Sequence, residues 1–320
     1  MRSTATVSRA FLRVAPYLLR VVGVVGLVAG IAAVARTIDR HALVAALAGA
    51  NVWLILLAAA LNFVTIGFKS TYWWSMVNAA APVSLAKMYR YTILSVTGSA
   101  LAPARAGDVL RVYLLRRDNA VAVRFAGTIF AIEKVADVAA LLLILVPVPW
   151  LMPQLPAWVA TGMRALSIVA ALAIVALIAM NASGRLRSML KIPDGMHRHL
   201  PLGFAAIVGS WLMDMVEVAL VLAAVGVTPS WAMCALILLA INFAISIPAT
   251  PGNAGALELG ATAALNVLGV AGDRAIGFAL LYHAMQLIPV IGVGLVLGRG
   301  VVRVPDASDD ESVEPAAVEG

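Results

Sequence analysis

Between two apolar stretches the chain reads Gly98-Ser99-Ala100-Leu101-Ala102-Pro103-Ala104-Arg105-Ala106-Gly107-Asp108-Val109-Leu110-Arg111. Proline has no N–H to donate, so Pro103 ends an incoming helix. We expect Gly107 to let the chain turn before a new helix begins. The N-terminus of that helix would present free N–H groups to an anion. Arg105 and Arg111 would add donors suited to phosphate.

Asp108 leaves a second interpretation of this first break open. An acid near the helix N-terminus competes for the same dipole, and it can instead pair with Arg111 three residues later. The break would then be a cytoplasmic turn with arginines at the membrane interface. The residues by themselves favour neither alternative.

A second break of similar composition lies in the C-terminal half. It reads Ser246-Ile247-Pro248-Ala249-Thr250-Pro251-Gly252-Asn253-Ala254-Gly255-Ala256-Leu257-Glu258. Thr250 or Asn253 could cap the helix that follows. These residues either close a hairpin or form part of a functional site together with the first break.

The two breaks share one pattern, which indicates an internal repeat. In each, a glycine follows a proline by four residues, and an acid follows the glycine by one or three residues: Pro103, Gly107 and Asp108, then Pro251, Gly255 and Glu258. A shift of about 148 positions places residues 48–146 on residues 203–298. Three membrane crossings would separate corresponding elements, so the second copy would be inverted. Inverted repeats with broken helices are typical of transporters and place the binding site where the breaks meet.

Composition makes the chain an integral membrane protein. It has 320 residues, 62% hydrophobic and 12% charged, and a mean hydropathy of +0.98, whereas about 25% of the residues in soluble domains are charged. Two apolar segments, 84–101 and 230–248, run into the breaks, and we interpret them as re-entrant. The stretches long enough to span a bilayer are 14–35, 48–68, 121–146, 159–181, 203–225 and 273–298.

These features predict an all-α fold, a polytopic transmembrane helical bundle with inverted repeats and two re-entrant broken helices. The membrane domain would cover residues 1–304. Residues 305–320 would form a disordered cytoplasmic tail, because six of the sixteen acidic residues lie there and aromatic residues do not.

Basic residues between the spans predict the orientation. Loops rich in arginine and lysine alternate with loops nearly free of charge, which places both termini in the cytoplasm and the chain in the cytoplasmic membrane. Lys69 is counted here in the loop after the second span. Because the net charge of +7 is spread over these loops, nucleic acid is a poor partner. Trp73, Trp74 and Trp150 lie near span ends and are expected to be interface anchors.

Charged residues inside predicted spans point into a bundle or a wet cavity. The third span carries Glu133, Lys134 and Asp137, with the two acids on one face. Either they form a structural ion-pair cluster with Arg105 or Arg111, or they balance charge or carry protons in a transport path. The later spans add Asp214, Glu217 and His283.

Other functional classes receive no support from the sequence. It has no phosphate-binding Walker motif, no Gly-x-Ser-x-Gly and no zinc-type His/Glu cluster. The single cysteine, Cys234, excludes a disulfide within one chain and a cysteine-based metal site. We therefore expect no cofactor and no metal, while an intramembrane enzyme built from scattered polar residues stays open.

The chain resembles the lysylphosphatidylglycerol synthase transmembrane-region family, also called flippase-like membrane proteins. The resemblance rests on three stretches: Ala102 to Arg117, with its Pro-x-Arg-x-Gly-Asp-x-x-Arg pattern; Glu133-Lys134-x-x-Asp137; and Pro251-Gly252-x-x-Gly255-x-x-Glu258. It covers about residues 10–300. Asp108 stands where the family usually has Glu, and Lys134 where Arg is common, which leaves the substrate preference open.

The resemblance implies movement of a lipid between leaflets, such as an aminoacylated phospholipid or a polyprenyl-phosphate-linked sugar. Bifunctional members add a cytoplasmic aminoacyl-transferase domain, and because this chain has an acidic tail there, we expect no lysine transfer. The leading hypothesis is a lipid flippase or lipid-binding transporter. The alternatives are an accessory subunit that presents lipid to a membrane synthase or glycosyltransferase, and an intramembrane lipid-modifying enzyme.

The predicted site residues fall into two groups. Those expected to bind the anionic headgroup are Pro103, Arg105, Gly107, Asp108, Arg111, Pro251, Gly252, Gly255 and Glu258. Those expected to balance charge or couple to protons are Glu133, Lys134, Asp137, Asp214, Glu217 and His283.

Overall fold

The computed structural model describes residues 44, 48–102, 106–151, 157–185, 196–246 and 250–299. Within these ranges the regular structure is entirely helical, as the sequence predicts. Pro103, Arg105, the expected first span at 14–35 and the acidic tail at 305–320 lie outside the described residues.

Three of the described helices are long and apolar enough to cross a membrane: α3 (Val52–Val77), α10 (Leu200–Ala224) and α13 (Gly272–Gly298). Two more predicted spans are also helices, α6 (Val123–Leu145) and α8 (Ala157–Ala182), joined through the short α7 (Val148–Leu151). The prediction for α3 was wrong at its end. The helix continues nine residues past 68, so Lys69 lies within the helix and not in a loop.

Polar caps fix where several helices begin. The Asn51 side chain accepts the N–H groups of Trp53 and Leu54 and so starts α3. Ser84 caps α4 (Leu85–Leu101) and Ser230 caps α11 (Trp231–Ala244) in the same way. Such side chains satisfy N–H groups that have no partner in the first turn of a helix, which matters most where no water can replace them.

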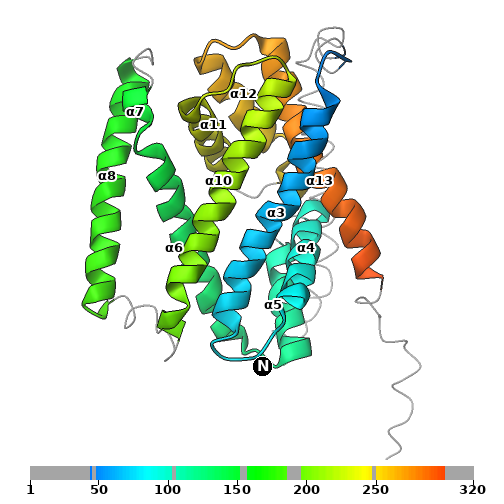
Figure 1. Cartoon of the computed structure of the whole chain (residues 1–320), viewed down its shortest axis with the longest axis vertical. Helices are drawn as coiled ribbons and strands as arrows, with labels where there is room; N and C mark the ends of the chain where they lie inside the picture. The colour runs from blue at the N-terminus through cyan, green and yellow to red at the C-terminus, as the bar shows by residue number, and fades with distance from the viewer. Residues whose placement is uncertain are drawn as a thin grey trace, which may run out of the picture.

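The long helices form the body of the bundle (Figure 1). Helix α10 packs along α3 through much of its length. Helices α6 and α8 pack against each other beside them, with α8 on the outside in Figure 1. Side chains tie α3 to its neighbours through backbone carbonyls. Asn62 donates to Gln286 of α13 at 3.0 Å, and Tyr72 donates to Ile129 of α6 at 2.7 Å.

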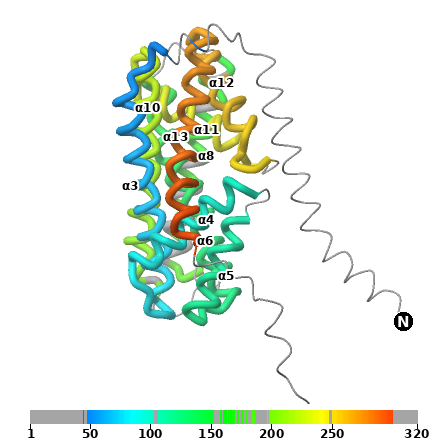
Figure 2. Tube along the Cα trace, turned by 90° about the vertical axis from the view of Figure 1, so that its right-hand side faces the viewer, coloured from blue at the N-terminus to red at the C-terminus, as the bar shows by residue number. Residues whose placement is uncertain are grey.

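Two pairs of shorter helices occupy opposite ends of this bundle. Helix α4 packs against α5 (Ala106–Asn119) in the lower half of Figures 1 and 2, and α11 packs against α12 (Ala256–Val267) in the upper half. The second break, which contains the short helix η2 (Pro251–Asn253), contacts α4. A Cβ at Gly252 would lie 3.4 Å from the carbonyl oxygen of Ala100. The described parts of the two breaks therefore meet near the middle of the molecule.

Candidate functional site

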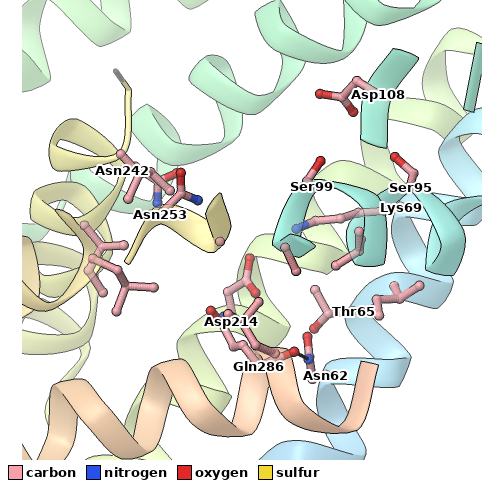
Figure 3. Close-up of a pocket in the computed structure, with 18 of the residues that line it drawn as sticks. Asn62, Thr65, Lys69, Ser95, Ser99, Asp108, Asp214, Asn242, Asn253 and Gln286 are labelled. Atoms are coloured by element: carbon pink, nitrogen blue, oxygen red, sulfur yellow. Dashed lines mark hydrogen bonds between the residues drawn. The ribbon is translucent and has the colours of Figure 1, made fainter. Parts of the chain in front are cut away.

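A polar cavity of about 380 Å³ lies where the two breaks meet (Figure 3). The first break contributes Ser99, Ala102 and Asp108, and the second contributes Thr250, Gly252 and Asn253. The long helices close the remaining sides. Their polar lining residues are Asn62, Thr65, Lys69, Glu133, Lys134, Asp137, Asp214, His283 and Gln286.

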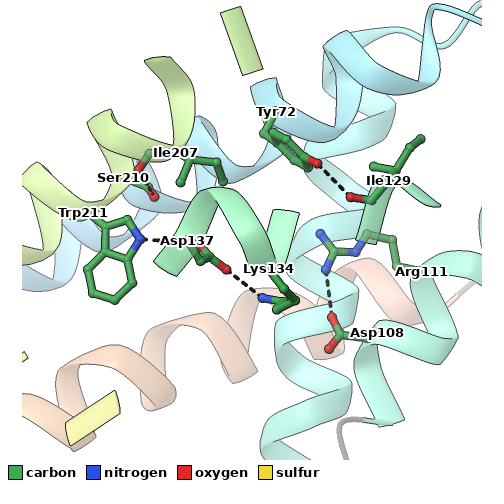
Figure 4. Close-up of polar contacts among 9 residues, drawn as sticks. All are labelled: Tyr72, Asp108, Arg111, Ile129, Lys134, Asp137, Ile207, Ser210 and Trp211. Atoms are coloured by element: carbon green, nitrogen blue, oxygen red, sulfur yellow. Dashed lines mark hydrogen bonds and ion pairs between the residues drawn. The ribbon is translucent and has the colours of Figure 1, made fainter. Parts of the chain in front are cut away.

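Arg111 is the buried cation of the first break. It is 5% exposed, and its Nη2 donates to Asp108 Oδ1 at 2.8 Å (Figure 4). Its guanidinium also lies over the Trp73 ring, 4.2 Å from the centroid. The predicted pairing of Asp108 with Arg111 is present, yet Arg111 Nε has no hydrogen-bond partner among the described residues. Arg111 thus has one buried donor that no described residue satisfies.

Two expectations near Arg111 need correction. Trp73 is completely buried, because it packs under the guanidinium and α3 extends past it, so it is no interface anchor. Gly107 does not serve a turn before the helix, because it lies in the first turn of α5. It is needed for close packing, since a Cβ there would overlap the backbone carbonyl of Ser95 in α4.

The residue that caps the start of α12 differs from the two that the sequence suggests. Neither Thr250 nor Asn253 caps this helix. Gly255 is its N-cap, and its N–H donates to Glu258 Oε2 at 2.7 Å. Thr250 instead donates to the Ala254 carbonyl. The acid Glu258 thus already satisfies a donor that was expected to face an anion.

His283 of α13 connects this break to the bundle. Its Nδ1 lies 2.6 Å from Glu258 Oε1, and its Nε2 lies 2.8 Å from the Gly252 carbonyl oxygen. The buried ring therefore fixes both the position of Gly252 in the cavity wall and the start of α12. Pro251 is also buried, next to Gly252.

Helix α6 supplies three charged groups to the cavity. Lys134 pairs with Asp137 at 2.8 Å, and Trp211 of α10 donates to the other Asp137 oxygen at 3.3 Å (Figure 4). Glu133 is 5% exposed, and its Oε2 has no hydrogen-bond partner among the described residues. Arg111 pairs with Asp108 and not with Glu133, while Arg105, the other expected partner, lies outside the described residues.

Helix α10 places its two acids differently. Asp214 lines the cavity, whereas the completely buried Glu217 lies beside it and accepts a hydrogen bond from Thr65 at 2.5 Å. One Glu217 oxygen has no partner among the described residues. A desolvated carboxylate without a full set of donors is costly, so the buried Glu217 is an uncommon feature of this bundle.

Lys69 is one of the cavity residues that the sequence did not predict. Its side chain extends from α3 into the cavity (Figure 3). A signal for it exists in the sequence. Asn62, Thr65 and Lys69 recur at intervals of three and four, which places three polar groups on one face of an apolar helix.

The cavity combines cations, acids and amides in one space, which is the chemistry that a charged ligand requires. Within the described part of the chain, no cluster of three or more His, Cys, Asp or Glu residues is placed to hold a metal ion.

Comparison with known proteins agrees with this picture. A family model described as "Lysylphosphatidylglycerol synthase TM region" matches residues 19–294. A search of curated proteins gives no match.

Proposed function

The chain belongs to the lysylphosphatidylglycerol synthase transmembrane-region family, and from this premise we propose that it is a lipid transporter that binds an anionic headgroup in the cavity between its two breaks. The protein is a membrane protein of a lipid-related family. The observation that carries the finer proposal is the cavity itself, which is polar, of ligand size and lined by both breaks.

Arg111 supports the anionic character of the ligand. Its Nε has no partner among the described residues and belongs to a guanidinium whose planar donors suit phosphate. Arg105, six residues earlier in the sequence, would add a second guanidinium from the same break. The anionic lipid would be a phospholipid or a polyprenyl-phosphate-linked lipid, held by its phosphate.

The positions of the short helix pairs support transport by alternating access. We propose that α4–α5 and α11–α12 are the re-entrant hairpins of two inverted repeats, entering from opposite faces. Their placement at opposite ends of the bundle fits this arrangement (Figure 2), as does the contact between η2 and α4. Rocking of one repeat against the other would open the site to each leaflet in turn. The protein would lie in the cytoplasmic membrane with both termini in the cytoplasm.

The intramembrane acids would balance charge while the lipid is bound. Glu133, Asp214 and Glu217 each line or border the cavity and have at least one carboxylate oxygen that accepts no hydrogen bond from a described residue. The proposal assigns them charge balance or proton coupling, together with Lys134, Asp137 and His283.

The test is leaflet exchange of fluorescent phosphatidylglycerol and polyprenyl phosphate in proteoliposomes. We compare the wild type with Arg111→Ala and Arg105→Ala, and use Arg116→Ala as the matched control because Arg116 is exposed on the same helix α5. Exchange by the wild type that falls at least tenfold in Arg111→Ala and stays unchanged in Arg116→Ala supports the proposal.

The same assay separates the alternatives. If the wild type moves neither probe, the transporter proposal fails, and the accessory-subunit hypothesis becomes the one to pursue with a search for a membrane synthase that copurifies. If the lipid is chemically altered during the assay, the protein is an intramembrane enzyme.

A further inference from the structure

Lys69 is a cation without a committed partner. It is half-buried on α3 and lines the cavity. No hydrogen bond and no ion pair within 4 Å joins its ammonium group to another described residue. Such a group is unusual inside a membrane protein, because a charged side chain there normally pairs or contacts a ligand or water.

The other two cations that line the cavity are already engaged. Arg111 pairs with Asp108 and stacks on Trp73, while Lys134 pairs with Asp137. An anion that bound these groups would compete with a carboxylate at 2.8 Å in each case. At Lys69 it would meet no such competitor.

We propose that the Lys69 ammonium is the primary contact for the anionic group of the lipid, and that Asp214 or Glu217 takes up a proton when this anion binds. The inference rests on the function proposed above and deepens it, because it adds Lys69 to Arg111 in the headgroup site and couples occupancy to protonation.

Charge balance in the cavity leads to the coupling. Apart from the two closed pairs, Lys69 is the single lysine or arginine among the described residues that line the cavity with Glu133 and Asp214. Glu217 accepts a hydrogen bond from Thr65, one turn before Lys69 on α3. An anion placed on Lys69 would leave these acids without their counter-charge in a desolvated site, which is costly unless one of them becomes neutral.

The groups that face Lys69 come from every helix packed around it. Helix α10 contributes the two acids of the proposal, and α4 contributes the uncharged Ser95 and Ser99. Helix α13 contributes His283, whose two nitrogens are occupied by Glu258 and Gly252. The remaining charged groups are Asp108 and Arg111 of α5 and Glu133, Lys134 and Asp137 of α6. Asp214 and Glu217 both belong to α10, the helix that packs most closely on α3. Each has a carboxylate oxygen without a hydrogen-bond donor among the described residues.

No covalent bond changes in the step. A proton moves from the aqueous phase onto a carboxylate as the anion binds Lys69. When the lipid leaves, Lys69 again neutralises the acid, which releases the proton. Proton uptake and lipid occupancy would then be reciprocal.

The experiment is isothermal titration of the purified full-length protein, in a neutral detergent, with dihexanoyl phosphatidylglycerol. Running it at pH 7 in two buffers of different ionisation enthalpy, PIPES and imidazole, gives the number of protons taken up per ligand. We expect net uptake by the wild type, and at least tenfold weaker binding by Lys69→Met. Lys69→Arg keeps the charge and should retain both binding and uptake.

Two further variants complete the design. The double variant Asp214→Asn with Glu217→Gln should still bind the probe but take up no proton. Lys87→Met is the matched control, because Lys87 lies near the start of α4 outside the cavity, and it should bind like the wild type. Size-exclusion profiles confirm that each variant is folded.

The outcomes are distinct. Wild-type affinity in folded Lys69→Met would overturn the contact between Lys69 and the anion. Binding by the wild type without proton uptake would overturn the coupling of binding to protonation. The proposed function would survive both results. If the wild type binds neither this probe nor a short polyprenyl phosphate, the proposed function fails and this inference fails with it.

Discussion

His283 lies between two polar groups from the second break and the start of α12. One group is the Glu258 carboxylate and the other is the Gly252 carbonyl. The ring therefore joins the second break and the start of α12 to α13 as one buried unit.

Replacing His283 should therefore destabilise the protein. His283→Ala leaves the Glu258 carboxylate without its side-chain partner and the Gly252 carbonyl without a donor. Breaking a buried pair of this kind costs about 3 kcal/mol. Thermal unfolding in detergent should show a lower midpoint for His283→Ala, whereas His199→Ala, which removes no side-chain cap at α10, should leave the midpoint unchanged. Equal midpoints for the two variants would contradict a stabilising role.

Helices α4 and α5 cross through glycines, and this sets the shape of the first break. A Cβ on Gly98 would lie 3.1 Å from the Gly107 Cα, and a Cβ on Gly107 would overlap the Ser95 backbone. Backbone atoms cannot move aside as the end of a flexible side chain can, so α4 and α5 can pack this closely only with glycine at both positions. That packing determines where Asp108 and Arg111 face the cavity.

Gly107→Ala is expected to force these helices apart. Overpacking against backbone costs about 3 kcal/mol, and the displaced Arg111 should also lower lipid exchange. Gly127→Ala on α6 is the control, because nothing lies within 4 Å of its added Cβ and alanine favours a helix by about 1 kcal/mol. We would measure unfolding midpoints of both. A stable, fully active Gly107→Ala protein would show that the crossing is not required.

The far end of the same helix pair carries a contact that depends on pH. Tyr91 of α4 donates to Asp118 of α5 at 2.5 Å, and Arg117 donates to the other Asp118 oxygen at 2.6 Å. The hydrogen bond from Arg117 holds the pKa of Asp118 below its ordinary value, although burial opposes this shift. Because its pKa is lower in the folded protein, the ionised Asp118 carboxylate stabilises the fold above about pH 4. This stabilisation is lost as the pH falls through the pKa of the folded state.

Asp118→Asn should reveal this contribution. At pH 7 the variant should unfold at a slightly lower temperature than the wild type; the difference is small because exposed pairs contribute little. Below about pH 4 the difference should shrink, because the wild-type carboxyl becomes protonated. Unfolding midpoints measured from pH 7 to pH 3 provide the check, and a constant difference across this range would refute the assignment.

The approach of the two breaks is a property of the whole molecule. Ala100 and Gly252 come from opposite halves of the chain and nearly touch. If alternating access moves one repeat against the other, this contact must open and close during each transport cycle.

A disulfide across the contact should stop the cycle. The variant carries Ala100→Cys and Gly252→Cys on a Cys234→Ala background, which removes the native free thiol. A Cβ at position 252 would lie 3.8 Å from the Ala100 Cα, within reach of disulfide geometry. Oxidant should abolish lipid exchange and reductant should restore it, while each single-cysteine variant should be insensitive to oxidant. Unchanged exchange by the cross-linked protein would mean that the breaks do not separate.

The sequence by itself determined that this is a helical membrane protein of one family. Long apolar runs need a bilayer, and only helices satisfy their backbone there without help from other segments. It also identified both breaks and many of the charged residues near them. Proline, glycine and charged residues are unfavourable within an apolar transmembrane helix, so they are conspicuous in such a sequence.

The tertiary structure decided which of those residues meet. Arg111 pairs with Asp108 and stacks on Trp73 because α3 continues past its expected end. For the same reason Lys69 lies in the cavity and not in a loop. Glu258 binds His283 from another helix, a contact between residues 25 positions apart. Partner choice depends on which helix faces lie against each other, and that is fixed by packing over the whole bundle, which local patterns do not encode.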